Sequence, residues 1–230
     1  MARLLAHVEG ETEEEFVNEV LGSYLRARGY DSVRATKVGS ARQRDHRGGT
    51  RAWSGVRKEI IRHLREDQGC IATTMVDYYG LPQTGDKAWP GRAHRGASAT
   101  AIKVAAVETA LLADISAEMG GSFNARRFIP FVAMHEFEGL LFSDCAAFAR
   151  GVGRPALQGK FQAIRDQFAT PEDINDSPLT APSKRIINLM PEYNKRLFGS
   201  LAALEIGLDK IRQACPHFHA WLARIETMAA

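Results

Sequence analysis

The residues Cys70–Val76 form a run in which every side chain is apolar or threonine. Such a run is typical of a strand that is covered on both faces, because a strand with one solvent-facing side alternates apolar and polar residues. Sheets of this kind are mostly parallel and lie between two layers of helices. This segment therefore favours an α/β protein, and it places Asp77, the next residue, at the edge of a buried sheet.

The segments around this run alternate between strand-like and helix-like patterns. Short apolar runs have the length of strands, and between them apolar residues recur at intervals of three and four, as they do on one face of a helix. This alternation predicts a largely parallel sheet packed between helices. We predict strands at residues 3–8, 32–38, 70–76 and 128–134, and helices at 12–29, 53–66 and 98–119.

Beyond about Phe142 the strand patterns fade. The remaining residues are typical of short helices joined by turns, and we find no internal repeat in them. We therefore divide the chain near Ser143 into an α/β domain of residues 1–143 and a helical extension of residues 144–230 that packs on the same core. The predicted helices of the extension are 146–149, 157–168, 184–190, 206–214 and 217–228.

Composition sets limits on the cellular setting and the partners. The three cysteines among the 230 residues have no paired spacing, which argues against a disulfide framework and favours a reducing cytoplasm. No apolar stretch approaches the roughly 18 residues that span a bilayer, and the N-terminal apolar run is too short for a signal peptide. The net charge of +3 permits an anionic partner without requiring one.

Carboxylates follow three of the predicted strands directly. Glu9 ends the first strand, Asp77 ends the strand at 70–76, and Glu136 and Glu138 follow the last one. Because the carboxyl ends of parallel strands share one edge of a sheet, these acids should meet there. Carboxylate oxygens are the ligands that Mg²⁺ or Mn²⁺ takes, and one or two such ions would suit displacement at phosphorus. We predict Glu9 and Asp77 as catalytic residues, and Glu9, Asp77, Glu136 and Glu138 as metal ligands.

Other roles compete for the same acids. Asp77 could be a turn former, and acids at the start of a helix are usually only caps or partners of the helix dipole. We assign this second role to Glu11, Glu13, Glu14 and Glu15. For Glu136 and Glu138 the apolar neighbours favour a metal, because an unpaired buried charge is costly. His135 is expected to be packed and hydrogen bonded rather than a proton shuttle or ligand.

Basic residues gather in three places that suit contact with phosphates. A glycine-rich and arginine-rich loop follows the second strand, a second basic group lies in the long loop after Asp77, and a third opens the helix after Pro182, where backbone amides also attract anions. Helix capping by Ser183 is an equal alternative for the third group, and Lys195 is a weaker candidate. The predicted phosphate or nucleic-acid contacts are Arg42, Arg44, Arg47, Arg51, Lys87, Arg92, Arg95, Lys184 and Arg185.

Several stretches resemble a known family. The segment VEGETEEEF after the first strand resembles the opening motif of Toprim domains, in which a glutamate followed by glycine serves in acid or base catalysis and metal binding. The whole chain is similar to the Toprim-like family of the domain of unknown function 4276. The matching stretches are VEGETEEEFV, TTMVDYYGLP, MHEFEGLLFSD, PEDIN, APSKRI and IGLDKIRQACPHFHAWL.

This resemblance implies a Toprim-like fold with a helical C-terminal extension. It also implies a nuclease effector of prokaryotic anti-phage systems that works with a separately encoded ATPase. The chain departs from the wider Toprim pattern at Tyr79, where a second aspartate usually follows the first at one residue's distance. Only Asp77 carries over, so Glu136 or Glu138 would have to replace the missing acid, or the site would serve recognition rather than catalysis.

Three functions agree with these patterns. The first is a metal-dependent nuclease with Mg²⁺ or Mn²⁺ at the strand ends. The second is a non-catalytic adaptor or sensor that binds a partner ATPase and nucleic acid. The third is hydrolysis of a small phosphorylated nucleotide. The sequence has no P-loop, so any use of ATP would come from the partner, and it is also compatible with a homo-oligomer.

Overall fold

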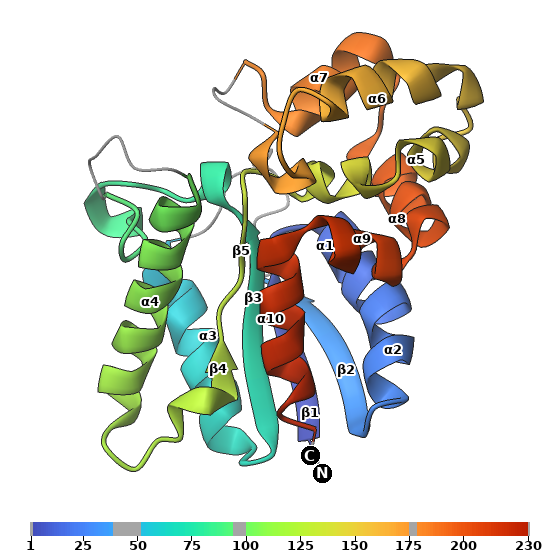
Figure 1. Cartoon of the computed structure of the whole chain (residues 1–230). Helices are drawn as coiled ribbons and strands as arrows, with labels where there is room; N and C mark the ends of the chain where they lie inside the picture. The colour runs from blue at the N-terminus through green and yellow to red at the C-terminus, as the bar shows by residue number, and fades with distance from the viewer. Residues whose placement is uncertain (1, 39–51, 94–99, 175–178, 230) are drawn as a thin grey trace.

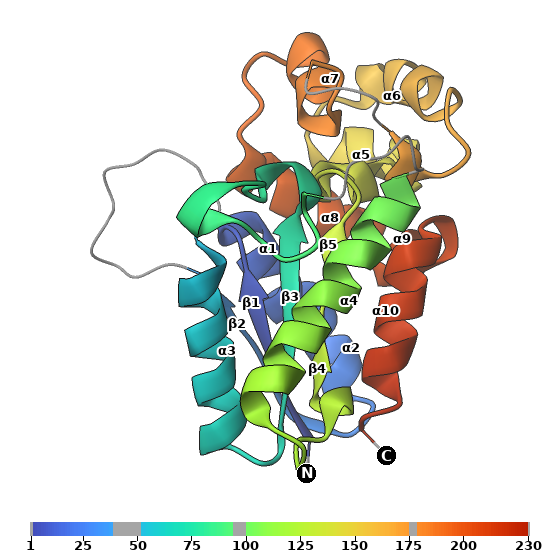
Figure 2. The same cartoon turned by 90° about the vertical axis from the view of Figure 1, so that its left-hand side faces the viewer.

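The computed structural model describes residues 2–38, 52–93, 100–174 and 179–229 (Figure 1). In these ranges the chain forms a β-sheet with helices on both faces, and further helices lie over one edge of the sheet (Figures 1 and 2). The predicted phosphate contacts Arg42, Arg44, Arg47, Arg51 and Arg95 lie outside the described residues.

The sheet contains five strands within the described residues, and all of its pairings are parallel. Its order is β2-β1-β3-β4, with β5 pairing β3 beyond the end of β4. The prediction of an α/β protein with a parallel sheet is therefore confirmed. The strands are β1 (Ala2–Val8), β2 (Tyr30–Lys37), β3 (Cys70–Asp77), β4 (Phe128–Ile129) and β5 (Val132–Ala133).

Strand β3 is the centre of the sheet, and all of its residues are buried. It pairs with β1 from Cys70 to Met75, and at its far end Asp77 lies opposite Ala133 of β5. The apolar run that suggested a covered strand is thus covered on both faces and both edges. Its carboxyl end points toward the helices that close the edge of the sheet (Figure 1).

The predicted strand 128–134 is interrupted and forms β4 and β5 instead. Pro130 has no amide hydrogen to donate to a sheet ladder, so the pairing with β3 is interrupted at this residue. Threonines of β3 replace the missing bonds: Thr74 Oγ1 lies 2.9 Å from the carbonyl oxygen of Phe131 and accepts from its amide at 3.0 Å. The two short strands therefore stay attached to β3, and the chain reaches the strand ends as expected.

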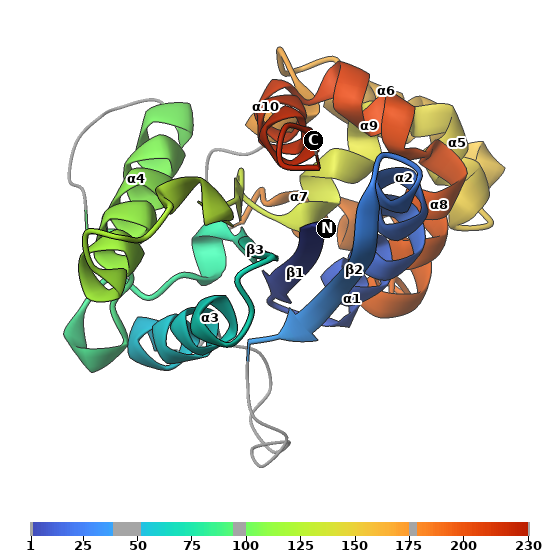
Figure 3. The ribbon, with the colours of Figure 1, turned by 90° about the horizontal axis from the view of Figure 1, so that it is seen from below.

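Helices cover the two faces of the sheet separately (Figure 3). One face is covered by α10 (Pro216–Glu226) and by three consecutive helical segments. These segments are α1 (Glu11–Glu15), the π-helix η1 (Phe16–Leu21) and α2 (Gly22–Arg26). The other face carries α3 (Trp53–Glu66) and α4 (Thr100–Met119). Two apolar clusters result, one beneath each layer of helices.

The C-terminal helices lie over the carboxyl edge of the sheet before the chain returns to its face (Figures 1 and 2). They are α5 (Cys145–Gly151), α6 (Gln158–Arg165), α7 (Pro182–Leu189), η8 (Lys195–Gly199), α8 (Ser200–Ile206) and α9 (Leu208–Ala214). Short 3₁₀ turns link the elements: η2 (Tyr78–Gly80), η3 (Gly85–Lys87), η4 (Ala125–Arg127), η5 (Phe137–Ser143), η6 (Pro155–Leu157) and η7 (Pro171–Asp173).

The apolar cluster on the α10 face runs across the proposed boundary near Ser143. Phe218 of α10 packs edge-on against Phe16 of η1 and Phe131, at ring-centroid distances of 6.0 Å. Phe148 of α5 belongs to the same cluster as Leu4 of β1. The residues after Ser143 therefore share a core with the sheet.

The helical path of residues 195–206 was not among the predicted helices. Leu197, Leu201 and Leu204 are large and exposed beside the polar Arg196 and Glu205, so the segment lacks the purely polar outer face of an ordinary surface helix. Its small residues face inward, where they allow helices to approach closely.

Among the described residues, no helix combines the length and the apolar character needed to cross a bilayer.

Gly151 shows how closely α8 approaches α5. A Cβ atom added at Gly151 would lie 2.6 Å from the Cα of Ala202, which is closer than real contacts allow. The two helices therefore meet backbone to backbone, and this contact fixes α8 and the preceding η8 over the edge of the sheet.

We predict that Gly151→Ala destabilises the protein by about 1–3 kcal/mol, because the added methyl group has no room against Ala202. Urea unfolding followed by circular dichroism measures the change. Gly159→Ala in α6 is the matched control, since nothing lies within 4 Å of the added Cβ; it should leave the stability unchanged or raise it slightly. Equal stability of the two variants would contradict the close approach.

Candidate functional site

The candidate site lies where β1, β3 and β5 end and the C-terminal helices close over the sheet (Figure 1). Glu9 follows β1, Asp77 is the last residue of β3, and Glu138 lies in η5, which follows β5. Glu13 joins them from α1. These four residues, which we call the carboxylate cluster, come from three separate parts of the chain and meet at the carboxyl edge, as parallel pairing predicts for the acids that follow strands.

Lys195 holds three members of the carboxylate cluster together. Its Nζ lies 3.1 Å from Asp77 Oδ2, 3.2 Å from Glu138 Oε2 and 3.3 Å from Glu13 Oε1. The side chain is 40% exposed, while those of Glu13 and Glu138 are 2% and 0% exposed. The ammonium therefore lies at the inner end of a partly exposed side chain, among carboxylates that water scarcely reaches.

Backbone amides fix the two acids at the strand ends. The amide of Asp77 donates to Glu9 Oε2 at 3.1 Å, and the amide of Phe137 donates to Asp77 Oδ1 at 2.8 Å. Glu9 thus bridges β1 and β3, and Asp77 bridges β3 and η5. Because each carboxylate is held by the neighbouring segment, its orientation follows from the pairing of the strands.

Glu13 is turned into the cluster by the start of its own helix. Gly10 precedes α1, and its amide donates to Glu13 Oε2 at 3.0 Å. The other oxygen, Oε1, faces Lys195. Glu13 therefore has the capping role expected from the sequence, but its side chain is also buried and faces Lys195, which was not predicted.

Glu138 is the most deeply buried acid of the cluster. Neither of its oxygens makes a hydrogen bond within the described residues, although Oε2 lies beside Lys195 Nζ. Its neighbours in η5, Phe137 and Leu140–Phe142, are buried and apolar. Burying a carboxylate without hydrogen bonds is costly, so Glu138 needs either a cation or a proton.

Burial and mutual repulsion raise the pKa values of Glu9, Glu13 and Glu138. Burial raises the pKa of Glu9 to about 7, and the negative charge of Asp77 adds to the shift. Burial raises the pKa of Glu138 to about 8, although the Lys195 ammonium opposes this shift. The pKa of Glu13 is raised by burial as well. Protons are therefore retained in the cluster near neutral pH.

Lys195 remains charged in spite of its surroundings. Burial by itself would lower the pKa of its ammonium, but the charges of Asp77, Glu138 and Glu13 raise this pKa well above the ordinary value. Among the described residues, Lys195 is the cation that pairs with the carboxylate cluster. The four carboxylates therefore exceed the positive charge provided for them.

Glu136, which the sequence analysis grouped with the metal ligands, faces a different partner. The amide of Ser183, near the beginning of α7, donates to Glu136 Oε2 at 2.9 Å. The predicted anion site at the start of this helix is therefore occupied by a carboxylate of the chain itself. Glu136 remains close enough for its charge to raise the pKa of Glu138.

The described basic residues differ in their surroundings. Lys87 and Lys184 are exposed, as contacts with phosphates require. Arg185 donates through Nε to the carbonyl oxygen of Thr180 at 2.8 Å. Arg92 is buried and donates to the carbonyl and hydroxyl oxygens of Tyr78, each at 3.1 Å. The phosphate contact predicted for Arg92 has no support from this placement.

Tyr79 stands where Toprim domains usually carry their second aspartate. Its amide donates to the carbonyl oxygen of His135 at 3.3 Å, and its ring lies 5.2 Å from the imidazole of His135. His135 is buried, in agreement with the packed role expected for it. Tyr79 thus supports the segment that leads to Glu138 and adds no oxygen anion to the cluster.

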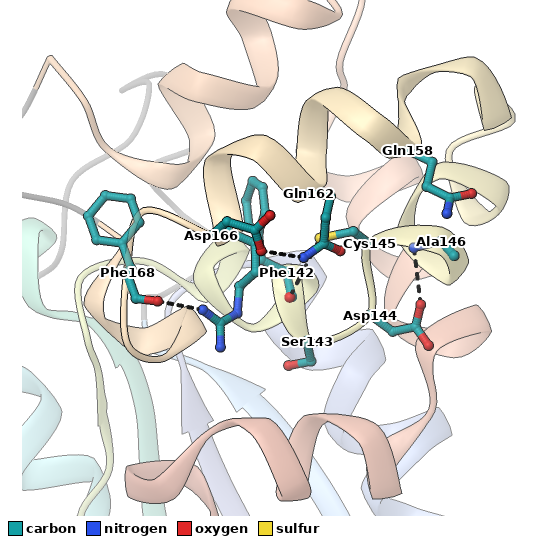
Figure 4. A pocket seen from close by; sticks show the side chains of 10 residues that line it. Phe142, Ser143, Asp144, Cys145, Ala146, Gln158, Gln162, Asp166 and Phe168 are labelled. Atoms are coloured by element: carbon teal, nitrogen blue, oxygen red, sulfur yellow. Dashed lines mark hydrogen bonds between the residues drawn. The ribbon is translucent and has the colours of Figure 1, made fainter.

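A cavity of about 470 Å³ lies between η5, α5 and α6, and no acid of the carboxylate cluster lines it (Figure 4). Its polar side chains are used by local structure. Asp144 accepts from the amides of Ala146 and Ala147 at the start of α5, and Gln162 donates to Asp166 at 2.7 Å. We therefore place the candidate site at the carboxylate cluster rather than in this cavity.

The carboxylate oxygens of the cluster are of the chemical type that binds a hard divalent cation, but their present spacing does not suit one. Carboxylate oxygens are the ligands that Mg²⁺ and Mn²⁺ take, and the buried Glu138 Oε1 has no hydrogen-bond partner within the described residues. As they stand, however, no three His, Cys, Asp or Glu side chains of the described residues could hold one metal ion. Their spacing fits the Lys195 ammonium instead.

We predict that the metal-free protein loses stability as the pH rises from about 4.5 to 8. In this window the folded chain keeps protons on Glu9 and Glu138 that unfolded glutamates have released, so the folded state binds more protons and stability falls with pH. The fall is on the order of a few kcal/mol. Glu138→Gln should flatten the curve of unfolding free energy against pH, measured in urea with a chelator present.

Glu19→Gln is the control for this pH dependence, because Glu19 is exposed on η1 outside the cluster. It should reproduce the slope of the wild-type curve. A wild-type stability that is constant or rises over the window, or a slope that Glu138→Gln leaves unchanged, would show that these protons are not retained.

Comparison with known families gives one match. Residues 8–226 match the model of the family described as a domain of unknown function, DUF4276. No curated protein and no solved structure matched the chain. Because the family model spans nearly the whole sequence, including every acid of the carboxylate cluster, the chain belongs to the DUF4276 family.

Proposed function

We propose that this protein is a divalent-metal-dependent nuclease that hydrolyses phosphodiester bonds of nucleic acid. The observation that carries the proposal is the carboxylate cluster. Glu9, Glu13, Asp77 and Glu138 meet at the carboxyl edge of a parallel sheet, the usual ligand-binding edge of such sheets, and the positive charge of Lys195 does not balance them. A surplus of oxygen anions at such an edge suits a hard cation and a phosphate bound through it.

Glu9 is suited to take a proton from an attacking water molecule. It is only partly buried, so water reaches it, and its raised pKa of about 7 lies near the pH at which a general base works best. Its Oε2 is held by the amide of Asp77. The same carboxylate could instead serve as a metal ligand, as the Toprim resemblance also implies.

Asp77 and Glu138 would hold the cation, and Glu136 stands beside them. Asp77 is fixed by the amide of Phe137, so its second oxygen has a defined direction toward the cluster. A bound Mg²⁺ or Mn²⁺ would neutralise charge on the phosphate and favour ionisation of water at neutral pH. Without a cation, the pKa values of Glu9 and Glu138 favour protonation, which would remove the base and a ligand together.

Contact with a polymer would come from exposed cations near the edge. Lys184 lies in the first turn of α7, next to Ser183, whose amide donates to Glu136. Lys87 lies in the loop after Asp77. Cations of this kind give affinity for phosphates that does not depend on sequence. The resemblance stated above further leads us to propose a cytoplasmic effector of anti-phage defence that works with a separately encoded ATPase.

One observation favours a second candidate, a non-catalytic adaptor that binds nucleic acid and a partner ATPase. Lys195 already pairs with three of the four carboxylates, and Tyr79 adds no further anion. A site whose cation belongs to the chain needs no metal for folding or recognition. Binding of nucleic acid without cleavage, at any concentration of Mg²⁺ or Mn²⁺, would support this candidate.

We predict that the wild-type protein cleaves plasmid DNA or RNA with Mg²⁺ or Mn²⁺, and that Glu9→Gln and Asp77→Asn each lower the rate at least about 100-fold. Both changes remove a charge but keep the shape of the side chain. Gel analysis of the products measures the rate, and thermal melting checks that each variant is folded. Glu19→Gln, on the same helical path but outside the cluster, should cleave like the wild type. Unchanged rates in both cluster variants would remove these acids from the mechanism.

A further inference from the structure

Lys195 reaches the carboxylate cluster from a helix that is anchored on α1. It begins η8, a π-helical segment, and such segments are frequent at functional sites. The next residue, Arg196, lies 2.9 Å from Glu11 Oε2 and 3.4 Å from Glu15 Oε1. Neighbouring cations of η8 thus bind acids of one short helix, and the ammonium of Lys195 has a fixed position.

That position has the surroundings of a bound cation. Oxygens of Glu13, Asp77 and Glu138, carried by α1, β3 and η5, lie 3.1–3.3 Å from Nζ. Three carboxyl groups from three elements surround one ammonium, whereas an ordinary surface lysine pairs with one acid. Without the ammonium, three carboxylates would face one another with no counter-charge in a buried setting, and this arrangement is strongly unfavourable.

Some of the oxygens around the ammonium have no hydrogen-bond partner among the described residues. Glu138 is 0% exposed, and its Oε1 has no hydrogen-bond partner within the described residues. The buried hydroxyl oxygen of Tyr193, two residues before Lys195, has none either. Unpaired buried oxygens are rare in native proteins, and here they leave acceptor capacity beside the ammonium.

We propose that the Lys195 ammonium fills a cation position formed by Glu13, Asp77 and Glu138, and that a divalent ion enters this position when the ammonium is removed. The inference deepens the proposed function, because it assigns part of the carboxylate cluster to a cation that the chain supplies itself. In the wild-type protein, a divalent ion then binds the oxygens of the cluster that Lys195 does not contact, among them Glu138 Oε1, together with the carboxylate of Glu9.

The test counts bound Mn²⁺ ions per chain, by isothermal titration calorimetry and by electron paramagnetic resonance of free Mn²⁺, in the absence of nucleic acid. Lys195→Met should bind one more Mn²⁺ ion than the wild type, because the methionine fills similar space without a charge. The double variant Lys195→Met/Glu138→Gln should lose this additional ion. An equal count in the wild type and in Lys195→Met would overturn the inference.

Arg196→Met is the matched control for this count. It removes the neighbouring cation, which pairs with the exposed acids Glu11 and Glu15 rather than with the carboxylate cluster. Its Mn²⁺ count should equal that of the wild type. An additional ion in Arg196→Met as well would mean that any lost positive charge attracts Mn²⁺, and the specific cation position would be refuted.

The number of bound Mn²⁺ ions tests the role of Lys195 independently of the proposed nuclease activity. A wild-type chain that binds no Mn²⁺ contradicts the metal-dependent nuclease, while the difference between wild type and Lys195→Met still decides the role of Lys195. If Lys195→Met does not fold without metal, Lys195→Gln, whose amide can still donate to the acids, provides the same comparison. Mn²⁺ should then raise the melting temperature of the Lys195 variant more than that of the wild type, and an equal rise would refute the position.

Discussion

The parallel pairing of β3 with β1 and β5 is the constraint on which the rest of the molecule depends. It covers both edges of β3, whose faces are buried by helices, and it makes three neighbouring segments end at the same level. Acids that follow those segments must then lie together, whatever their distance along the chain. The helices after Ser143 complete the arrangement, because they close the edge and bring Lys195 into it.

The site that results contains four carboxyl groups and one ammonium among the described residues, so its negative charges are not balanced by positive ones. Buried ion pairs contribute little to stability unless every charge is compensated, and here acids outnumber the ammonium that binds them. The chain compensates with protons, as the raised pKa values of Glu9 and Glu138 indicate. Perturbed acids of this kind gather at functional sites more often than elsewhere.

The sequence predicted those features that depend on local pattern and on strand direction. The helix 53–66 and the burial of β3 follow from residue periodicity, and the meeting of Glu9, Asp77 and Glu138 follows from their places after parallel strands. The contact of Glu13 with Lys195 was missed because an acid in the first turn of a helix is usually solvated, and Glu13 also caps its own helix. Lys195 had no local signal: it lies 118 positions from Asp77, and only tertiary packing brings them together. The partner amide of Glu136 had no signal either, since it belongs to a helix that no local pattern places beside this acid.

The contact between Glu136 and the amide of Ser183 links α7 to the charge state of the cluster. The helix that covers the edge is held by an acid two positions from Glu138, and the charge of that acid also acts on Glu138. Thermodynamic linkage is reciprocal, so whatever changes the charge within the cluster also changes how firmly α7 is held. The packing of α7 on the sheet and the ionisation of the carboxylate cluster should therefore change together.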